Sequence, residues 1–226
     1  MISSVFITKE VDNESELTKW CNKNNIKLVN KSFLHFESLT SSVLPFGEVY
    51  FFTSKRAVSF FLSQHKIPDE VQIACVGQST ANEFLKRGID VDFIGTSSGN
   101  PMIIAKEISN FIDQKSIVFI GALEGSDAIY SQVDSNSKRK YPVYKTIIIP
   151  ERVNDKFDYY VFTSPSNLKG FSELNSLPTN PHVTAWGKTT EKAMFEKNIK
   201  PIYTLENSCE NELISKLSLL EEGQGR

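Results

Sequence analysis

Serine, threonine and glycine residues follow several short apolar runs of this sequence, where a strand would end and a helix begin. Three such segments are Thr53-Ser54-Lys55-Arg56, Gly77-Gln78-Ser79-Thr80 and Gly121 to Asp127. Two more are Thr163-Ser164-Pro165-Ser166-Asn167 and Gly187-Lys188-Thr189-Thr190. Open α/β sheets bind ligands at the carboxyl ends of their strands. Each segment is expected to open a helix, whose free N–H groups and dipole favour a carboxylate or phosphate.

Each of these residues also has a structural interpretation, because Ser and Thr are common helix caps. Five such termini in one chain nevertheless favour a site for a polyanion. Arg56 supports this hypothesis, since a basic side chain in the first turn of a helix gains nothing from the dipole. A ligand anion would explain its position, and a surface arginine lying along its helix is the alternative. Lys188 has the same two interpretations.

Tyr144 lies in the extended stretch Pro142-Val143-Tyr144-Lys145-Thr146. Its phenol could donate a proton to a leaving oxygen or hydrogen-bond a ligand. Core packing is the alternative, and the residues alone favour it. The preceding run, Lys138-Arg139-Lys140, is interpreted as a solvated turn.

The composition excludes several classes of protein. The 226 residues carry a formal net charge of −2, with acids and bases spread along the chain, which argues against binding to nucleic acid or an anionic membrane. The three cysteines, without a CxxC spacing, predict buried free thiols rather than disulfides or a zinc site. Metal binding is not expected from three scattered histidines. We see no export signal, no transmembrane run and no cofactor motif such as GxGxxG or a P-loop, and therefore expect a cytoplasmic protein without a cofactor.

Apolar strand-like runs alternate with segments of helical period, which predicts an α/β fold with parallel sheets. The expected strands are residues 5–7, 27–29, 49–52, 73–76, 91–94, 117–120, 159–162, 183–186 and 202–205. A helix over 13–23 is expected to begin with a capping box, Asn13 and Glu16, and to stop at Asn24-Asn25. Helices over 80–87 and 190–197 are expected to stop at Gly88 and Asn198.

An internal repeat links the two halves of the chain. Phe52-Thr53-Ser54 recurs as Phe162-Thr163-Ser164, an offset of 162 − 52 = 110 residues. At the same offset, Gly77 and Thr80 recur as Gly187 and Thr190, Asn198 replaces Gly88, and Ile89 recurs as Ile199. One offset for strand, loop, helix and helix stop predicts two halves of similar fold.

Two extended stretches near residues 31–37 and 141–149 are interpreted as paired strands that cross between two domains. We therefore expect a discontinuous α/β domain formed by residues 1–34 and 148–226. A central α/β domain of residues 36–146 would be inserted into it.

Five motifs in order resemble the uroporphyrinogen-III synthase family. Residues 51–58 are similar to the family's first Thr-Ser motif, and residues 75–81 to its Val-Gly-x-x-Thr-Ala motif. Val143 to Thr146 is similar to Val-Tyr-x-Thr, and residues 161–166 to Phe-Thr-Ser-Pro-Ser. Trp186 to Thr190 resembles Ile-Gly-x-Thr-Thr, although Lys188 stands where proline is common and Glu191 where a small residue is usual.

The resemblance implies two flavodoxin-like domains joined by a two-stranded linker, with the polycarboxylate hydroxymethylbilane bound in the cleft between them. It implies loss of the terminal hydroxyl, a spiro intermediate and ring closure with the terminal pyrrole inverted, on the way to haem. Tyr144 would assist departure of the hydroxyl, and positioning would supply most of the catalysis. The implied substrate-binding residues are Thr53, Ser54, Arg56, Gly77, Ser79, Thr80, Gly121, Ser164, Ser166, Gly187, Lys188, Thr189 and Thr190. No cofactor or metal is implied. We expect a monomer, with transient contact to the preceding or following enzyme of the pathway.

Two other classes of function remain open. One is a non-catalytic two-domain protein that binds a small anion, and the missing export signal argues against a periplasmic carrier of this kind. The other is a flavodoxin-like receiver or flavin module. The absence of an acidic cluster after the first strand and of a nucleotide loop argues against it.

Overall fold

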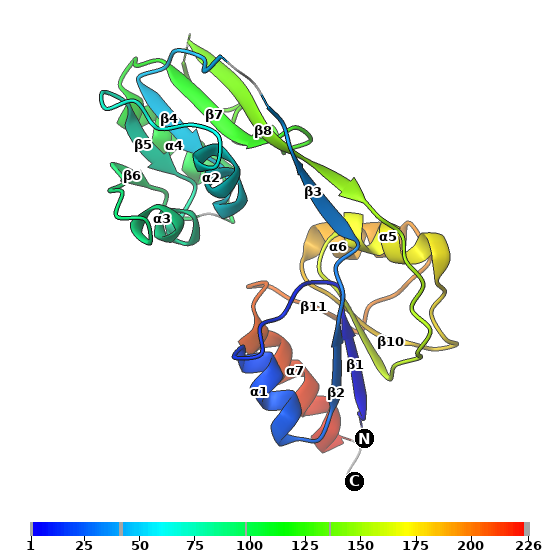
Figure 1. Ribbon diagram of the computed structural model, residues 1–226. Coiled ribbons are helices and arrows are strands. Elements are labelled where there is room, and N and C mark those ends of the chain that lie inside the picture. The colour runs from blue at the N-terminus through cyan, green and yellow to red at the C-terminus, as the bar shows by residue number, and fades with distance from the viewer. Residues whose placement is uncertain (1, 41–42, 98, 136, 224–226) are drawn as a thin grey trace. The chain divides into compact units, whose positions relative to one another are not determined.

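The computed structural model describes residues 2–40, 43–97, 99–135 and 137–223 (Figure 1). The chain divides into two compact units. Unit 1 comprises the residues up to His35 and those from Ile147 onward, and unit 2 is Phe36–Thr146. The boundaries fall within two strands, β3 (Leu34–Ser38) and β8 (Lys138–Ile148).

The sheet of unit 2 has the order β3-β8-β7-β4-β5-β6. Its further strands are β4 (Val49–Phe52), β5 (Gln72–Cys75), β6 (Phe93–Ile94) and β7 (Ile117–Ala122). The pairs from β8 to β6 are parallel. β3 runs against β8, since Leu39 N–H donates to Val143 O at 3.0 Å and Ile149 N–H to Phe33 O at 2.9 Å. The predicted α/β class with parallel sheets is confirmed.

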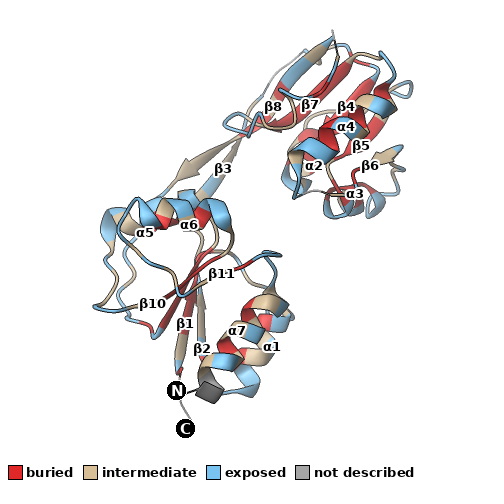
Figure 2. Ribbon diagram, turned by 180° about the vertical axis from the view of Figure 1, so that it is seen from behind, coloured by how far each residue is buried: buried red, intermediate tan, exposed pale blue. Residues whose placement is uncertain are grey.

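Helices cover both faces of this sheet. Residues of α2 (Lys55–Leu62) and α3 (Gln78–Leu85) pack with Tyr50 and Phe52 of β4. Residues of α4 (Pro101–Ile112) pack on the other face with Val49 and Phe51. All four residues of β4 are buried, because alternate side chains enter different cores (Figure 2).

Unit 1 has a five-stranded sheet of order β11-β10-β9-β1-β2, and all its pairs are parallel. The strands are β1 (Ser4–Ile7), β2 (Lys27–Asn30), β9 (Tyr159–Phe162), β10 (His182–Ala185) and β11 (Tyr203–Thr204). Residues of α1 (Glu16–Lys23) and α7 (Glu210–Gly223) share one core with Val5 and Ile7. Residues of α5 (Pro165–Leu174) and α6 (Lys188–Phe195) share the other with Phe6.

The internal repeat is present in the backbone. Ser54 caps α2 with φ −165° and ψ 156°, and Ser164 caps α5 with φ −160° and ψ 159°. Each Oγ accepts a hydrogen bond of 3.1 Å from the backbone N–H three residues later. Gly88 (φ 70°) and Asn198 (φ 57°) are left-handed, as predicted for the stops after α3 and α6. These two helices begin at Gln78 and Lys188, two residues earlier than predicted.

The predicted capping box of the first helix is wrong. Its N-cap is Ser15, whose Oγ accepts from Thr18 N–H at 3.1 Å. Asp12 forms the preceding turn, because its Oδ1 accepts from Glu14 N–H and its carbonyl from Ser15 N–H. The left-handed stop is confirmed at Asn25, whose φ is 56°.

Two further predictions fail around β7 and β8. The segment from Gly121 to Asp127 does not open a helix; β7 continues to Ala122, and Leu123 N–H then donates to Tyr144 O at 2.8 Å. Its backbone is therefore held by turns and by β8. The run from Lys138 to Lys140 is not a turn, because these residues begin β8 and pair with Ile117 to Phe119.

An acidic residue ahead of the central strand anchors the neighbouring strand in each unit. Asp158 Oδ2 accepts from the backbone N–H and hydroxyl of Ser3, at 2.9 and 2.6 Å, and from those of Ser4, each at 3.0 Å. Glu48 Oε2 accepts from Ser116 N–H at 2.9 Å and from its hydroxyl at 3.0 Å. The serine hydrogen bonds hold the pKa of Asp158 below its ordinary value of 3.8.

The cysteines differ from the prediction at one position. Cys21 and Cys75 are buried free thiols, whereas Cys209 is exposed. Burial raises the pKa of Cys21 to about 11 and that of Cys75 to about 12. Both therefore stay protonated near neutral pH.

We expect a disulfide reagent at pH 8 to modify Cys209 rapidly in the folded protein and to leave Cys21 and Cys75 unmodified. In denaturant all three should react. Mass spectrometry of the labelled peptides measures this directly. Rapid labelling of Cys75 without denaturant would contradict the packing of unit 2.

Asp158→Asn should lower the free energy of unfolding at pH 7 by about 1 kcal/mol, because charge-assisted hydrogen bonds at an exposed site are weakened by solvent. The lowered folded pKa means that this stabilisation is present above the ordinary carboxyl pKa and is lost as the pH falls through the folded value. The difference from wild type in urea unfolding should thus shrink below about pH 4. Asp155→Asn, which breaks only the exposed ion pair with Lys27, is the control and should change little.

Candidate functional site

A cavity of about 540 Å³ lies at the carboxyl edge of the sheet of unit 2. Four predicted site residues line it together: Thr53, Ser54, Gly121 and Tyr144. Its other described lining residues are Val76, Pro101, Phe119, Ala122, Leu123, Gly125, Ser126, Asp127, Ala128, Ile129, Tyr130, Lys140 and Pro142. The structure therefore combines polar groups at the strand ends with apolar walls.

The register of β4 and β7 brings Thr53 and Gly121 side by side. Phe52 lies opposite Ile120, so both strands end at the same level. Thr53 N–H and Oγ1–H both donate to Ile120 O, at 3.1 and 3.2 Å. A Cβ on residue 121 would come within 2.5 Å of Thr53 Oγ1, so the close approach requires glycine.

Ser54 joins the start of α2 to Tyr144. Its Oγ accepts from Ala57 N–H at 3.1 Å and lies 3.4 Å from Tyr144 Oη. The aromatic ring of Tyr144 is stacked on Phe60, with centroids 5.2 Å apart and an interplanar angle of 18°. Phe36 contacts the ring edge-on at 6.0 Å. The ring thus packs as a core residue, while the residue also lines the cavity.

Arg56 is exposed, and its guanidinium carbon lies 3.4 Å from the centre of the Phe36 ring. Its distance to the centre of the Tyr144 ring is 6.0 Å. Within the described ranges it forms no ion pair. A cation–π contact is therefore a third explanation for its position, and it leaves the guanidinium edge able to bind an anion.

Gly77, Ser79 and Thr80 lie at the start of α3 and do not line the cavity. Gly77 provides no side-chain cap, so the first N–H groups of this helix have no side-chain acceptor. Thr80 is 1% exposed, and its backbone N–H donates to Gly77 O at 3.0 Å. Ser79 is exposed.

Unit 1 repeats this arrangement at its own strand ends. Ser164 and Ser166 lie at the capped start of α5. Gly187 precedes α6 without a side-chain cap, Lys188 and Thr189 are exposed, and Thr190 is 2% exposed. Glu191 stands where a small residue is usual in the family's last motif. Its Oε1 accepts a 2.6 Å hydrogen bond from Thr204 Oγ1, which connects α6 to β11.

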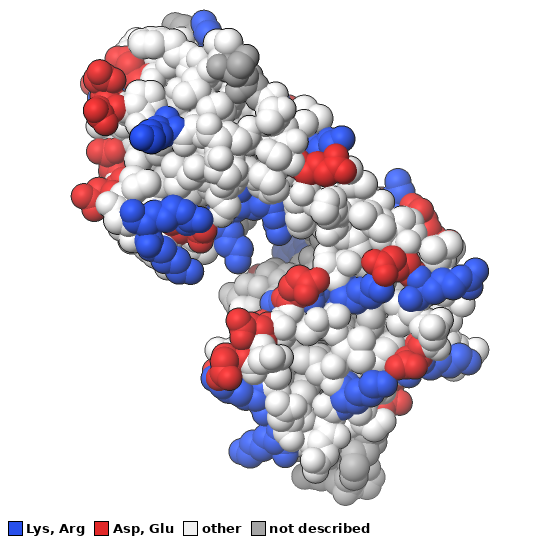
Figure 3. All heavy atoms as spheres, viewed as in Figure 1, with Lys and Arg blue, Asp and Glu red and all other residues white. Residues whose placement is uncertain are grey.

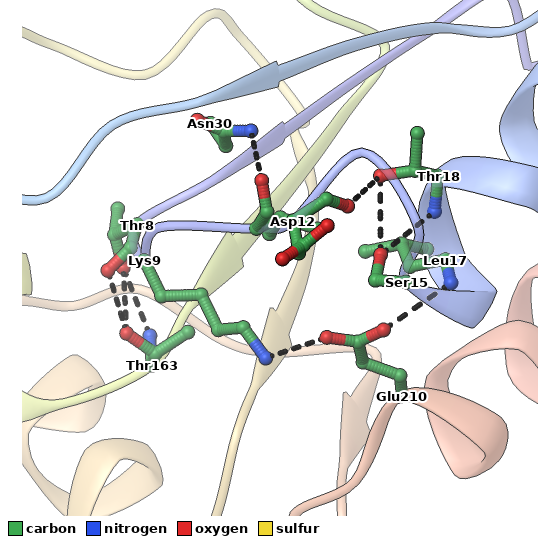
Figure 4. Close-up of polar contacts among 10 residues, drawn as sticks. Thr8, Lys9, Asp12, Ser15, Leu17, Thr18, Asn30, Thr163 and Glu210 are labelled. Atoms are coloured by element: carbon green, nitrogen blue, oxygen red, sulfur yellow. Dashed lines mark hydrogen bonds and ion pairs between the residues drawn. The ribbon is translucent and has the colours of Figure 1, made fainter.

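The sequence analysis missed Lys9, which follows the end of β1. At this strand end Thr163 Oγ1 donates to Thr8 O at 2.7 Å (Figure 4). The equivalent bond in unit 2 joins Thr53 Oγ1 to Ile120 O. Lys9 Nζ donates to Glu210 Oε1 at 2.8 Å and lies 4.7 Å from the centre of the Trp186 ring. Burial alone would raise the pKa of Glu210, but hydrogen bonds from Lys9 and from Leu17 N–H outweigh it and lower this pKa. Lys9 follows β1 as Gly121 lies near the end of β7, and because β1 precedes β9 whereas β7 follows β4, the 110-residue repeat carried no signal for it.

Lys140 and Asp127 are also cavity residues that the sequence analysis did not select. Lys140 was assigned to a solvated turn, but it lies on β8 and its Nζ forms an ion pair with Asp127 Oδ1.

Acids and bases are interspersed over the face shown in Figure 3. In the described ranges, no cluster of three or more His, Cys, Asp or Glu could hold a metal ion.

The profile of the family described as uroporphyrinogen-III synthase HemD matches residues 38–215. The chain belongs to the uroporphyrinogen-III synthase family. Enzymes of this family are cyclising hydro-lyases of haem biosynthesis that act on hydroxymethylbilane, and this chain is a uroporphyrinogen-III synthase of that kind. The non-catalytic alternative is not supported.

Solved structures carry the same fold. A uroporphyrinogen-III synthetase from Helicobacter pylori is similar with a TM-score of 0.68 and 18% identity, covering 97% of this chain and 99% of that one. A mutant uroporphyrinogen III synthase from Thermus thermophilus has a TM-score of 0.58 and 14% identity, covering 98% of each chain. A comparison with curated protein sequences found no match. Among the described residues, no helix is long and apolar enough to span a membrane.

Ser54→Ala and Ser164→Ala should each lower the free energy of unfolding by about 1 kcal/mol, since each removes an equivalent helix cap. Both serines are expected substrate contacts, so either variant should raise KM, but only Ser54→Ala also removes the hydroxyl next to Tyr144 and should lower kcat beyond its loss of stability. Urea unfolding and steady-state kinetics separate the two effects. Equal loss of turnover in both variants would contradict a specific role of the Ser54–Tyr144 contact.

Proposed function

We propose that the chain forms uroporphyrinogen III by using Tyr144 to assist departure of the substrate hydroxyl. The observation that carries this proposal is that Tyr144 lines the same cavity as Ser54, Thr53 and Gly121. In the first step the terminal C–O bond breaks, the pyrrole nitrogen supplies the electrons, and the hydroxyl leaves as water after gaining a proton. Tyr144 Oη provides that proton or a hydrogen bond to the leaving oxygen.

Ser54 directs the phenol proton in this proposal. Its Oγ already accepts from Ala57 N–H, so its own proton is available for Tyr144 Oη at 3.4 Å. Tyr144 can then direct its proton into the cavity. Stacking on Phe60 restricts rotation of the ring and keeps the hydroxyl at this position.

The second step is attack on the exocyclic carbon by the substituted carbon of the last pyrrole, which gives a spiro intermediate. A bond of that intermediate breaks and closes again at the other position, so the terminal ring is inverted. Loss of a proton restores the aromatic pyrrole. The protein contributes mainly by holding the chain ends for this closure, since the unrearranged isomer forms without it.

The carboxylates of the substrate are proposed to bind at the strand ends of each unit. The uncapped starts of α3, at Gly77 and Ser79, and of α6, at Gly187 and Thr189, offer backbone N–H groups. Arg56 and Lys188, both exposed, add positive charge. Thr80 and Thr190 have buried side chains, and their N–H groups donate to Gly77 O and Gly187 O at 3.0 Å, so both would orient the starts of α3 and α6 rather than touch the substrate. The remaining proposed contacts are Thr53, Ser54, Gly121, Ser164 and Ser166.

We further propose that the enzyme acts as a monomer in the cytoplasm, with transient contacts to the neighbouring pathway enzymes. The free thiols of Cys21, Cys75 and Cys209 support a reducing compartment.

Tyr144→Phe should lower kcat about 100-fold while leaving the fold intact, because it removes only the proton donor. Freshly generated hydroxymethylbilane is supplied to the enzyme, the products are oxidised, and the type I and type III isomers are separated. Slower enzymatic closure should raise the type I fraction. Tyr50→Phe is the control, since its hydroxyl bonds Pro45 O at 3.0 Å and does not line the cavity. Unchanged kcat in Tyr144→Phe would remove the assigned role.

A further inference from the structure

The ion pair between Lys140 and Asp127 lies in the lining of the cavity, yet neither residue has a place in the reaction described above. Lys140 is the sole cation and Asp127 the sole anion among the described lining residues. Their side chains are 47% and 61% exposed. Both are therefore accessible to a ligand that enters the cavity.

Neighbouring basic residues on the same strand have different surroundings. Lys138 Nζ donates to Tyr130 O at 2.9 Å and to Val133 O at 2.8 Å, and so fastens the turn before β8. Arg139 is exposed and does not line the cavity. Lys140 Nζ lies 4.7 Å from the centre of the Tyr130 ring, and its hydrogen-bond partner is the carboxylate of Asp127. Among the described residues, Asp127 is thus the ionic partner of Lys140, and another carboxylate could take its place.

The side chain of Asp127 can move without disturbing its backbone. Ser131 N–H and Ser131 Oγ–H both donate to Asp127 O at 2.8 Å, which fixes the main chain. An ion pair between exposed side chains contributes little to stability. Replacing Asp127 by another carboxylate at Lys140 therefore costs little.

The rest of the cavity suits a flat ring that bears carboxylates. Apolar walls come from Val76, Phe119, Ile129 and Pro142, while the hydroxyls of Thr53 and Ser54 lie at the strand ends. A volume of about 540 Å³ is within the range of small-molecule sites. A substituted pyrrole would place its ring against the apolar walls and an acidic side chain beside Lys140.

We propose that the cavity of unit 2 binds one carboxylate-bearing pyrrole of the substrate, that Lys140 binds its carboxylate, and that Asp127 occupies Lys140 until the substrate displaces it. The proposal rests on the function given above. Asp127 acts as an internal competitor, so a ring without a carboxylate gains nothing from Lys140. The pair thereby selects acidic pyrroles over neutral ones.

The test compares Asp127→Asn, Lys140→Met and the double variant, with Arg139→Met as the matched control. Asp127→Asn should lower KM for hydroxymethylbilane about threefold by removing the competitor. Lys140→Met should raise KM about tenfold by removing a charge-assisted hydrogen bond, with a smaller effect on kcat. In the double variant the benefit of Asp127→Asn should disappear, because no ammonium remains. Arg139→Met removes the same charge from the same strand and should behave as wild type.

A binding measurement separates this proposal from the enzymatic one. Porphobilinogen, a monopyrrole with one acetate and one propionate, is titrated into each variant and followed by NMR. Its dissociation constant should follow the order of the KM values, whereas its dimethyl ester should bind wild type and Lys140→Met equally weakly. Suppose that wild type makes type III product but Lys140→Met changes neither KM for hydroxymethylbilane nor the dissociation constant of porphobilinogen. The cavity is then not the pyrrole site, and the proposed function stands. If wild type makes no type III product, the proposed function is wrong. The order of the porphobilinogen dissociation constants among the variants then still shows whether the cavity binds an acidic pyrrole. Additive effects in the double variant would overturn the competition between Asp127 and the ligand.

Discussion

The arrangement of the site in unit 2 depends on the parallel register of β4 and β7. Because Phe52 lies opposite Ile120, the next residues, Thr53 and Gly121, meet at the edge of the sheet. Their approach leaves no space for a Cβ at position 121. The chain can then continue to Leu123, whose N–H reaches Tyr144 O at 2.8 Å, and this bond places Tyr144 across from the start of α2. The contact between Ser54 and Tyr144 is a consequence of that pairing.

The repeated unit uses the same backbone with different side chains, which gives the two strand edges different chemistry. In unit 1 Thr8 takes the position of Ile120. Thr163 Oγ1 donates to Thr8 O as Thr53 Oγ1 donates to Ile120 O, but Thr8 also offers a hydroxyl, which accepts from Thr163 N–H at 2.9 Å. Lys9 then stands where unit 2 has Gly121. A lysine stacked against Trp186 and paired with Glu210 fills the place that a glycine leaves open. A repeated fold therefore provides similar N–H groups twice, whereas the cavity described for unit 2 depends on its glycine.

Features with a local signal could be predicted from the sequence, and features set by tertiary pairing could not. The apolar strands, the left-handed stops at Asn25, Gly88 and Asn198, and the equivalent caps of α2 and α5 depend on a few adjacent residues. The prediction of a helix after Gly121 was wrong because Leu123 N–H bonds Tyr144 O of β8, a partner 21 residues along the chain that the local sequence does not indicate. The prediction that Lys140 lies in a solvated turn was wrong for a related reason. A basic run is ordinarily solvated, and only the pairing of β8 with β7 places Lys140 in the lining of the cavity. The contact between Ser54 and Tyr144 spans 90 residues and had no local signal beyond the family resemblance.

A neutral acid is well suited to a substrate that carries many carboxylates. A protonated Asp or Glu would become an anion at neutral pH unless its pKa were strongly raised, and an anion would repel the substrate. A phenolic hydroxyl is a neutral hydrogen-bond donor, so a tyrosine at this place adds no repulsion while the substrate binds. The one carboxylate among the described lining residues, Asp127, is neutralised by Lys140. Packing of the Tyr144 ring against Phe60 and Phe36 fixes the hydroxyl in advance, which is the preorganisation that catalysis by positioning requires. The core-like burial of the ring and a chemical role for the hydroxyl are therefore compatible, because the first holds the second in place.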